Sequence, residues 1–189
     1  MIRAFIAVPV PVDVKRAAES ARARCSDIQG SLRWVAPANI HLTLKFLGDV
    51  DMSRVAAVTA LLADTVSVAS FALASGGLGV FPSVKRPRVL WMGVAGETAR
   101  FIDFARLLDA RLADLGFAKE RRPFRAHLTL GRFKGKTDPK RLAGVLLAAA
   151  GTDSVPFEAD RVILFQSELK PTGAVHTPLA AYPLTAGSA

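Results

Sequence analysis

The stretch IHLTLKFLG, residues 40–48, shares the tetrapeptide HLTL with the stretch AHLTLGRFK, residues 126–134. In both copies leucines alternate with polar residues, which is typical of a β-strand with one buried face. The two copies lie 86 residues apart, and no linker rich in proline, glycine or serine separates them. We therefore expect a single bilobal domain over residues 1–189, with motif strands near 40–47 and 125–133, one in each lobe.

The remaining sequence predicts a mixture of strands and helices, because apolar residues recur at intervals of two in some stretches and of three or four in others. The clearest helix is 98–116, which ends at Gly116. The other expected helices are 13–28, 51–65 and 138–150. The expected strands are 3–10, a broken run over 32–48, 71–81, 88–94, 124–133, 157–169 and 175–184, the last two flanking a turn at 170–173. The fold class is therefore α+β.

Composition points to a compact protein with an attraction for anions. Of the 189 residues 51% are hydrophobic and 22% are charged, and 25 Lys and Arg against 16 Asp and Glu give a net charge of +9. Such a balance favours encounter with nucleic acids, nucleotides or acidic membranes. The single Cys25 cannot form an internal disulfide, and no apolar run is long enough to span a membrane. We expect a soluble cytoplasmic protein with no membrane partner.

The repeated motif carries groups suited to phosphodiester cleavage. Along a strand, His41 and Thr43 share one face, as do His127 and Thr129 in the second copy. Imidazole exchanges protons near neutral pH, so two histidines supply the acid and the base that cleavage requires. Threonine hydroxyls donate hydrogen bonds to phosphate oxygens as charge develops on them. Two such strands facing each other would form a four-residue cage that needs no metal and no other cofactor.

Two other interpretations of these residues remain. A single histidine on a half-apolar strand is usually a packed or surface residue, but two of the chain's three histidines lie in identical tetrapeptides. A zinc site built from all three histidines would lack the clustered spacing and the acidic neighbours of known zinc motifs. We therefore favour the phosphodiesterase chemistry, and we expect the third histidine, His176, at the surface or at the rim of the cleft.

Positive charge beside the motifs would bind a phosphate. Strand alternation places Lys45 on the face of His41 and Thr43, while its counterpart Gly131 leaves space. Arg132 follows directly, and an arginine can bind phosphate oxygens in bidentate fashion. We expect Arg132 and Lys45 to contribute to substrate binding.

The sequence resembles the two-histidine (2H) phosphoesterase superfamily, and specifically its RNA 2′,3′-cyclic phosphodiesterases, also called 2′-5′ RNA ligases. The resemblance spans nearly the whole chain. It rests on RAFIAV at 3–8, WVAPANIHLTLKFLG at 34–48, PFRAHLTLGR at 123–132 and SELKPTG at 167–173. It implies a fold of two pseudo-symmetric lobes whose antiparallel sheets line a central, positively charged cleft with helices outside, in a monomer without a metal.

The resemblance also implies an activity. Family members open a terminal 2′,3′-cyclic phosphate on RNA to a 2′-phosphate, and some join or cleave 2′-5′ linkages by the same chemistry. On that pattern His127 activates water and His41 protonates the departing 3′ oxygen, although the two roles could be reversed. Two residues depart from the family pattern: Ala126, where a proline is frequent, and His176, near a position where a tyrosine is common.

We therefore predict an RNA 2′,3′-cyclic phosphodiesterase whose partners are RNA ends or nucleotides bearing a cyclic phosphate. Two alternatives stay open. One is an RNA-binding module with a basic cleft and no significant turnover. The other is a phosphodiesterase acting on 2′-5′ oligonucleotides or on ADP-ribose cyclic phosphate, whose motifs would look the same.

Overall fold

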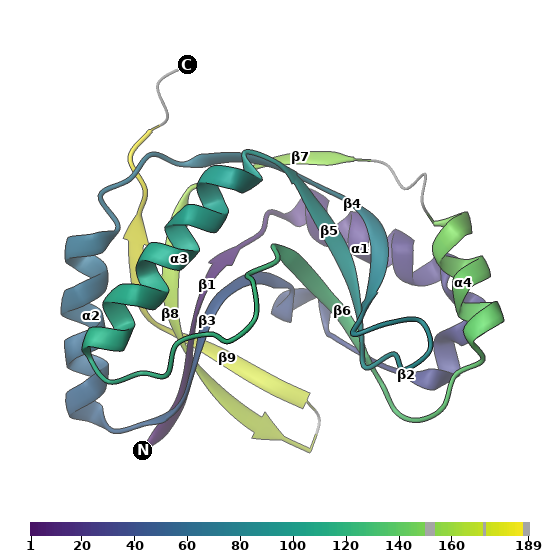
Figure 1. Cartoon of the computed structure of the whole chain (residues 1–189), viewed down its shortest axis with the longest axis horizontal. Helices are drawn as coiled ribbons and strands as arrows, with labels where there is room; N and C mark the ends of the chain where they lie inside the picture. Colours follow the sequence, from purple (N-terminus) through teal and green to yellow (C-terminus); the bar gives the residue numbers. More distant parts are fainter. Residues whose placement is uncertain (150–153, 172, 187–189) are drawn as a thin grey trace.

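The computed structural model describes residues 1–149, 154–171 and 173–186 (Figure 1). Four α-helices and nine strands lie in this part of the chain. The helices are α1 (Val12–Arg24), α2 (Met52–Thr65), α3 (Thr98–Asp114) and α4 (Pro139–Ala148). The strands are β1 (Ile2–Pro9), β2 (Leu32–Trp34), β3 (His41–Val50), β4 (Phe71–Phe81), β5 (Val89–Gly96), β6 (His127–Phe133), β7 (Val155–Ala159), β8 (Arg161–Lys170) and β9 (Gly173–Pro183). The predicted α+β class is confirmed.

Element boundaries differ from the sequence prediction mainly where a strand was expected to continue. The run 157–169 is not one strand, because the chain leaves β7 and enters β8 at Asp160, and these two strands pair with different partners, β4 and β1. Alternation alone does not show this break. Position 150 of the expected helix 138–150 and position 172 of the expected turn lie outside the described residues.

The strands form one continuous antiparallel sheet rather than two separate ones. Its order is β7-β4-β5-β6-β3-β1-β8-β9, with β2 also paired to β6. The order is symmetric about its middle, where the motif strands β6 and β3 meet. Each half therefore forms one lobe, and the lobes join through the pair Leu42 and Leu128.

The helices that cover the two lobes are exchanged between them. Figure 1 shows α2 and α3 together beside β1, β3 and β8, and α1 and α4 together beside β4 and β5. Helix α1 follows β1 in the chain but contacts β7 of the other half, and α3 follows β5 but contacts β3 of the other half as well as β4. Each lobe is thus covered by two helices. One follows the motif strand of that lobe in the chain, and the other comes from the other repeat, so the two lobes interlock.

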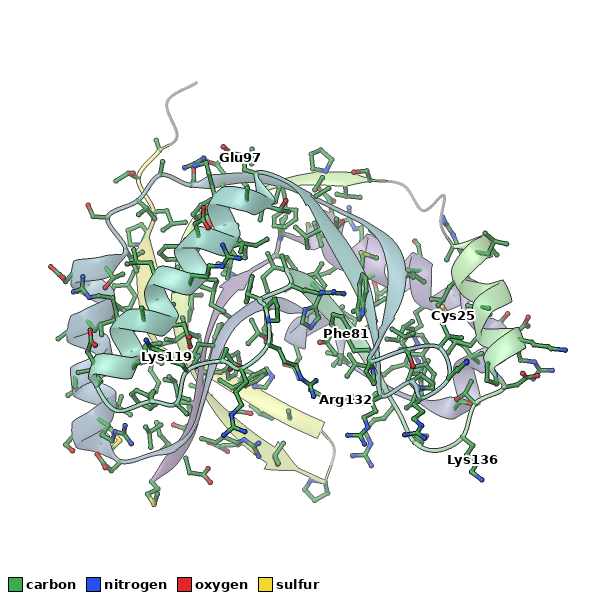
Figure 2. The ribbon with its side chains drawn as sticks, viewed as in Figure 1. Cys25, Phe81, Glu97, Lys119, Arg132 and Lys136 are labelled. Atoms are coloured by element: carbon green, nitrogen blue, oxygen red, sulfur yellow. The ribbon has the colours of Figure 1, made fainter. Side chains whose placement is uncertain are left out.

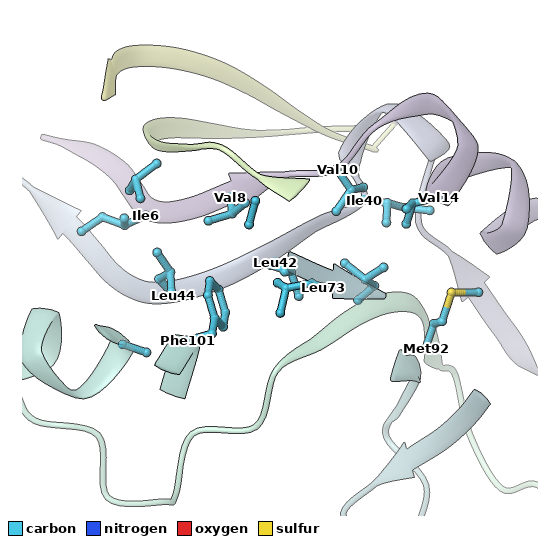
Figure 3. Packing of buried hydrophobic residues seen from close by; sticks show 14 of the residues in the cluster. Ile6, Val8, Val10, Val14, Ile40, Leu42, Leu44, Leu73, Met92 and Phe101 are labelled. Carbon is cyan, nitrogen blue, oxygen red and sulfur yellow. The ribbon is translucent and has the colours of Figure 1, made fainter. Parts of the chain in front are cut away.

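The core lies between the sheet and these helices. The four motif leucines are buried, with exposed fractions of 5% or less, as their alternation with polar residues predicted. Leu42 and Leu44 lie in the same cluster as Ile6 of β1 and Phe101 of α3 (Figure 3). Burial of a leucine side chain stabilises a fold by about 1.5 to 3 kcal/mol, so packing fixes which face of each motif strand points inward.

Candidate functional site

The four motif side chains meet where the two lobes join. Leu42 of β3 pairs with Leu128 of β6 in an antiparallel register. Extended by one residue to either side, this register brings His41 toward Thr129 and Thr43 toward His127. Both leucines point into the core, so the histidines and threonines point to the opposite face of the sheet. The tertiary structure brings the two motifs together on that face.

A β-bulge follows the motif in each lobe at the same position. Thr43 pairs with Ala7, but the next pairing is Lys45 with Ile6, so an extra residue stands in β3. The same shift occurs in β6, where Thr129 pairs with Trp91 and Gly131 pairs with Leu90. A bulge reverses the alternation of faces beyond it. The side chains that continue the histidine face are therefore Phe46 and Arg132, which are exposed, and not Lys45 and Gly131, which are buried.

The prediction that Lys45 lies on the face of His41 and Thr43 is wrong for this reason. Its side chain is only 3% exposed and forms an ion pair with Asp109 of α3. The ammonium also donates to the carbonyl oxygen of Ala118 at 2.6 Å and lies 3.6 Å from Glu120. Lys45 ties β3 to α3 and to the connection that follows this helix, and its charge is largely neutralised there.

Arg132 lies near the end of β6 on the histidine face, in the region between the two lobes in Figure 2. Burial is the main cause of a lowered pKa of His127, and the positive charge of Arg132 lowers it further. Of the two cations expected to bind substrate, the structure brings Arg132 to the motif face. Arg125 approaches His127 through its backbone carbonyl.

The ring of His127 is held by one hydrogen bond and by aromatic contacts. Its Nδ1 lies 2.7 Å from the carbonyl oxygen of Arg125. A carbonyl only accepts, so Nδ1 carries the proton in the neutral ring and Nε2 is left as the free acceptor. Phe81 of β4 meets the ring edge-on at 5.0 Å between centroids, and Trp91 lies at 6.5 Å. Figure 2 labels Phe81.

The ring of His41 lies in a larger aromatic cluster. It stacks on Phe5 with 4.8 Å between centroids and an interplanar angle of 26°. Phe165 lies 6.2 Å away, and His176 meets the ring edge-on at 5.5 Å. The backbone of Asn39 forms a hydrogen bond that favours the charged form of His41. The two motif histidines are thus both supported by the backbone two residues before them.

Burial makes these histidines less basic than free imidazole. The pKa of His41 is lowered to about 4, chiefly by burial and then by the charge of His176, while the hydrogen bond to the Asn39 backbone opposes both effects. Burial also lowers the pKa of His127, opposed by the bond to Arg125 and reinforced by Arg132. Each group is therefore neutral at pH 7 in the free protein, because burial and nearby positive charge disfavour the imidazolium form.

Sequence reasoning placed His176 at the surface or the rim of the cleft, and the structure has its side chain half-buried beside His41. The ring is packed against His41 and lies 4.9 Å from Phe5. Its strand is brought there by Asn39, whose side-chain amide donates to the carbonyl oxygen of Ala174 at 2.6 Å. Burial lowers the pKa of His176, and its Nδ1 has no hydrogen-bond partner within the described part of the chain. In the sequence, His176 was marked only as the third histidine and as a departure from the family pattern.

The described ranges hold neither a metal-binding cluster nor a membrane-spanning helix. Among residues 1–149, 154–171 and 173–186, no three His, Cys, Asp or Glu side chains gather closely enough to hold a metal ion. No helix in the same ranges has the length and apolar character needed to cross a membrane.

Comparison with known proteins identifies relatives across the whole chain. The family model described as LigT like Phosphoesterase matches residues 8–91 and 94–176, so each matched stretch contains one motif. A protein of Methanothermobacter thermautotrophicus named RNA 2′,3′-cyclic phosphodiesterase is 30% identical over 184 residues, 97% of this chain and 99% of its own. A protein of Aquifex aeolicus with the same name is 31% identical over 179 residues, 94% of each chain.

Solved structures agree with this likeness. The protein TT0787 of Thermus thermophilus has a TM-score of 0.79 and 27% identity, and covers 99% of this chain and 100% of its own. Escherichia coli LigT in its apo form has a TM-score of 0.78 and 27% identity, with 97% and 98% covered. The complex of that protein with 3′-AMP has a TM-score of 0.77 and 25% identity over the same shares.

Proposed function

Because the chain belongs to the LigT-like phosphoesterase family, we propose that it is an RNA 2′,3′-cyclic phosphodiesterase that converts a terminal cyclic phosphate into a 2′-phosphate. The observation that carries the proposal is the pairing of Leu42 with Leu128. This register places two imidazoles and two threonine hydroxyls on one face at the junction of the lobes. The relatives named RNA 2′,3′-cyclic phosphodiesterase support a phosphoesterase activity for the chain.

In the proposed reaction the two histidines exchange protons with water and with the leaving oxygen. His127 Nε2 takes a proton from water, and the water oxygen forms a bond to phosphorus. The bond between phosphorus and the 3′ oxygen then breaks. The 3′ oxygen keeps the electron pair of that bond and receives a proton from His41. The bond between His127 Nδ1 and the Arg125 carbonyl supports the base role, because it leaves Nε2 unprotonated in the neutral ring.

The proton that His41 donates must be present when substrate is bound. In the free protein its pKa is about 4, so the ring is neutral near pH 7. A cyclic phosphate carries a negative charge, and an opposite charge within about 4 to 6 Å favours the imidazolium form. Substrate binding therefore raises the pKa of His41 toward the working pH and charges the acid only in the complex.

The threonines and Arg132 stabilise the phosphate in this scheme. The hydroxyls of Thr43 and Thr129 donate to non-bridging oxygens, whose negative charge grows as phosphorus becomes five-coordinate. The guanidinium of Arg132, exposed on the same face, binds one of these oxygens. The reverse reaction, which would join ends through a 2′-5′ linkage, uses the same groups.

We extend the proposal to a monomer that acts in the cytoplasm without a metal. Support for the chemistry without a metal comes from the two histidines, which suffice as acid and base. The one cysteine, Cys25, is free and buried, which agrees with a reducing compartment.

The test is turnover of nucleoside and short-RNA 2′,3′-cyclic phosphates in EDTA by the native protein and by the His41→Ala and His127→Ala variants. We expect a 2′-phosphate product from the native protein and none from either variant, with all three equally folded by circular dichroism. If all three are inert but bind RNA with the same affinity, the chain is an RNA-binding module. Preferential turnover of 2′-5′ oligonucleotides or ADP-ribose cyclic phosphate in the same panel would replace the substrate assignment.

A further inference from the structure

A pocket of about 470 Å³ lies beside the proposed site, between β3 and the connection from α3 to β6. One wall is residues 45–47 of β3 and the other is residues 117–122 of the connection. Both walls lead to the motifs, because 45–47 follows Thr43 along β3 and 117–122 precedes His127. Phe46 in the first wall contacts Phe5 at 5.9 Å between ring centroids, and Phe5 stacks on His41.

The lining of this pocket is cationic and carries one exposed aromatic ring. Lys119, Arg121 and Arg122 are exposed along the connection. The one carboxylate in the lining is that of Glu120, which faces the buried ammonium of Lys45 at 3.6 Å. Phe46 is 58% exposed, although a phenylalanine on a strand is ordinarily buried.

The connection is fixed in place rather than held only by its ends. Lys45 donates to the carbonyl oxygen of Ala118, and the Asp109 carboxylate accepts from the backbone N–H of Glu120 at 3.2 Å. Because Lys45 and Asp109 also pair with each other, these contacts anchor residues 118–120 to both β3 and α3. The cations that flank this anchor are therefore presented from a braced backbone, which lowers the entropy cost of binding.

We propose that this pocket binds the RNA strand immediately 5′ of the cyclic end, with Phe46 stacked on a base and Lys119, Arg121 and Arg122 paired with backbone phosphates. The inference rests on the proposed function. A terminal cyclic phosphate has the whole RNA on its 5′ side, so the strand must leave the motifs across a neighbouring surface. Basic grooves with exposed aromatic rings are how proteins bind single strands without reading their sequence. The pocket thus makes the enzyme prefer an RNA end to a mononucleotide.

The test compares kcat/KM for a nucleoside 2′,3′-cyclic phosphate with that for a short RNA ending in the same group. We expect two variants, Phe46→Ala and separately Arg121→Ala/Arg122→Ala, to lower kcat/KM for the RNA relative to kcat/KM for the mononucleotide. The expected loss is about fivefold or more, which is the lower bound for loss of one stacked base. The double variant should also reduce the salt slope of RNA binding by about 0.7 for each lost phosphate contact. Arg141→Ala, an exposed arginine on α4, removes a charge away from the pocket and should leave the ratio unchanged.

Equal losses on both substrates, or no loss on either, would overturn the pocket assignment. If the native protein turns over neither substrate, the proposed function fails, and the pocket is then tested by binding alone. In that case Kd is measured for a short RNA ending in a 2′-phosphate. A weaker Kd in the pocket variants but not in Arg141→Ala supports the pocket, and an unchanged Kd in all three overturns it.

Discussion

His176 meets His41 edge-on, with 5.5 Å between ring centroids and an angle of 78° between the ring planes. The two residues come from strands at a distance in the chain, and β1 and β8 lie between these strands in the sheet. A charge on one ring disfavours a charge on the other. Protonation of His176 therefore lowers the pKa of His41, the proposed acid.

We predict that His176→Phe raises the pKa of His41. Burial, the main cause of the lowered pKa, stays because the new ring fills the same space, but the repulsion from His176 is lost. NMR titration of the His41 ring should show its midpoint at a higher pH, while that of His127 stays in place as an internal control. An unchanged His41 midpoint would mean that His176 carries no charge in the relevant range.

The substrate range is a separate expectation for the same position. His176→Tyr changes the size and hydrogen bonding of the side chain that packs against His41, so the preference of the variant among the cyclic phosphate panel should differ from that of the native protein. Identical profiles would show that β9 does not contact the substrate.

The pH dependence of the reaction should differ between the free and the bound enzyme. Burial lowers the pKa of both motif histidines, so each loses its proton at a lower pH than free imidazole. The profile of kcat/KM, which reports the free enzyme, should peak below the ordinary histidine pKa of about 6.5. The anionic substrate favours the charged rings, so kcat should peak at a higher pH. A kcat/KM optimum above pH 7, or coincident optima, would contradict this.

The threonines should affect turnover more than binding. Thr43→Val and Thr129→Val keep the side-chain shape but remove the donor, and loss of one such hydrogen bond to a developing charge costs about 10²- to 10³-fold in kcat. KM should change much less, because the bond strengthens as charge grows on the phosphate. A rise in KM at constant kcat would show instead that the hydroxyls hold the substrate equally before and during the reaction.

Lys45 should matter for stability instead of for phosphate binding. Lys45→Met leaves Asp109 without its buried partner, and loss of such a partner costs about 1 to 3 kcal/mol of unfolding free energy. Urea unfolding measures this change. The matched double variant Lys45→Met/Asp109→Leu removes both charges and should recover much of the loss. Equal destabilisation by the single and the double variant would show that packing, and not the pair, is responsible.

Sequence alternation was reliable as far as a strand stayed regular. It placed Leu42 and Leu128 in the core and His41 and His127 on the opposite face, because successive side chains of a strand point to opposite sides. It failed at Lys45, because a bulge between Thr43 and Lys45 adds one residue to β3 and shifts the faces beyond it. A bulge depends on how the neighbouring strand is paired, and that neighbour is not visible in the local pattern.

The alternation of side chains could not predict contacts between segments that lie far apart in the chain. The break at Asp160 sends β7 and β8 to different lobes, and nothing in the alternation of 157–169 marks it. Likewise the approach of His176 to His41 depends on the path of β9 and on the bond from Asn39 to Ala174.

The sequence by itself determined which groups the two motif strands present: both contain the tetrapeptide HLTL, with an inward leucine face and an outward imidazole and hydroxyl, since side-chain alternation is a local property of the backbone. Only the tertiary structure decided that these strands pair at Leu42 and Leu128, that Arg132 rather than Lys45 joins them, and that His176 completes the surroundings of His41. These depend on register, bulges and the exchange of α1 and α3 between lobes, all of which are settled by contacts between residues far apart in the chain.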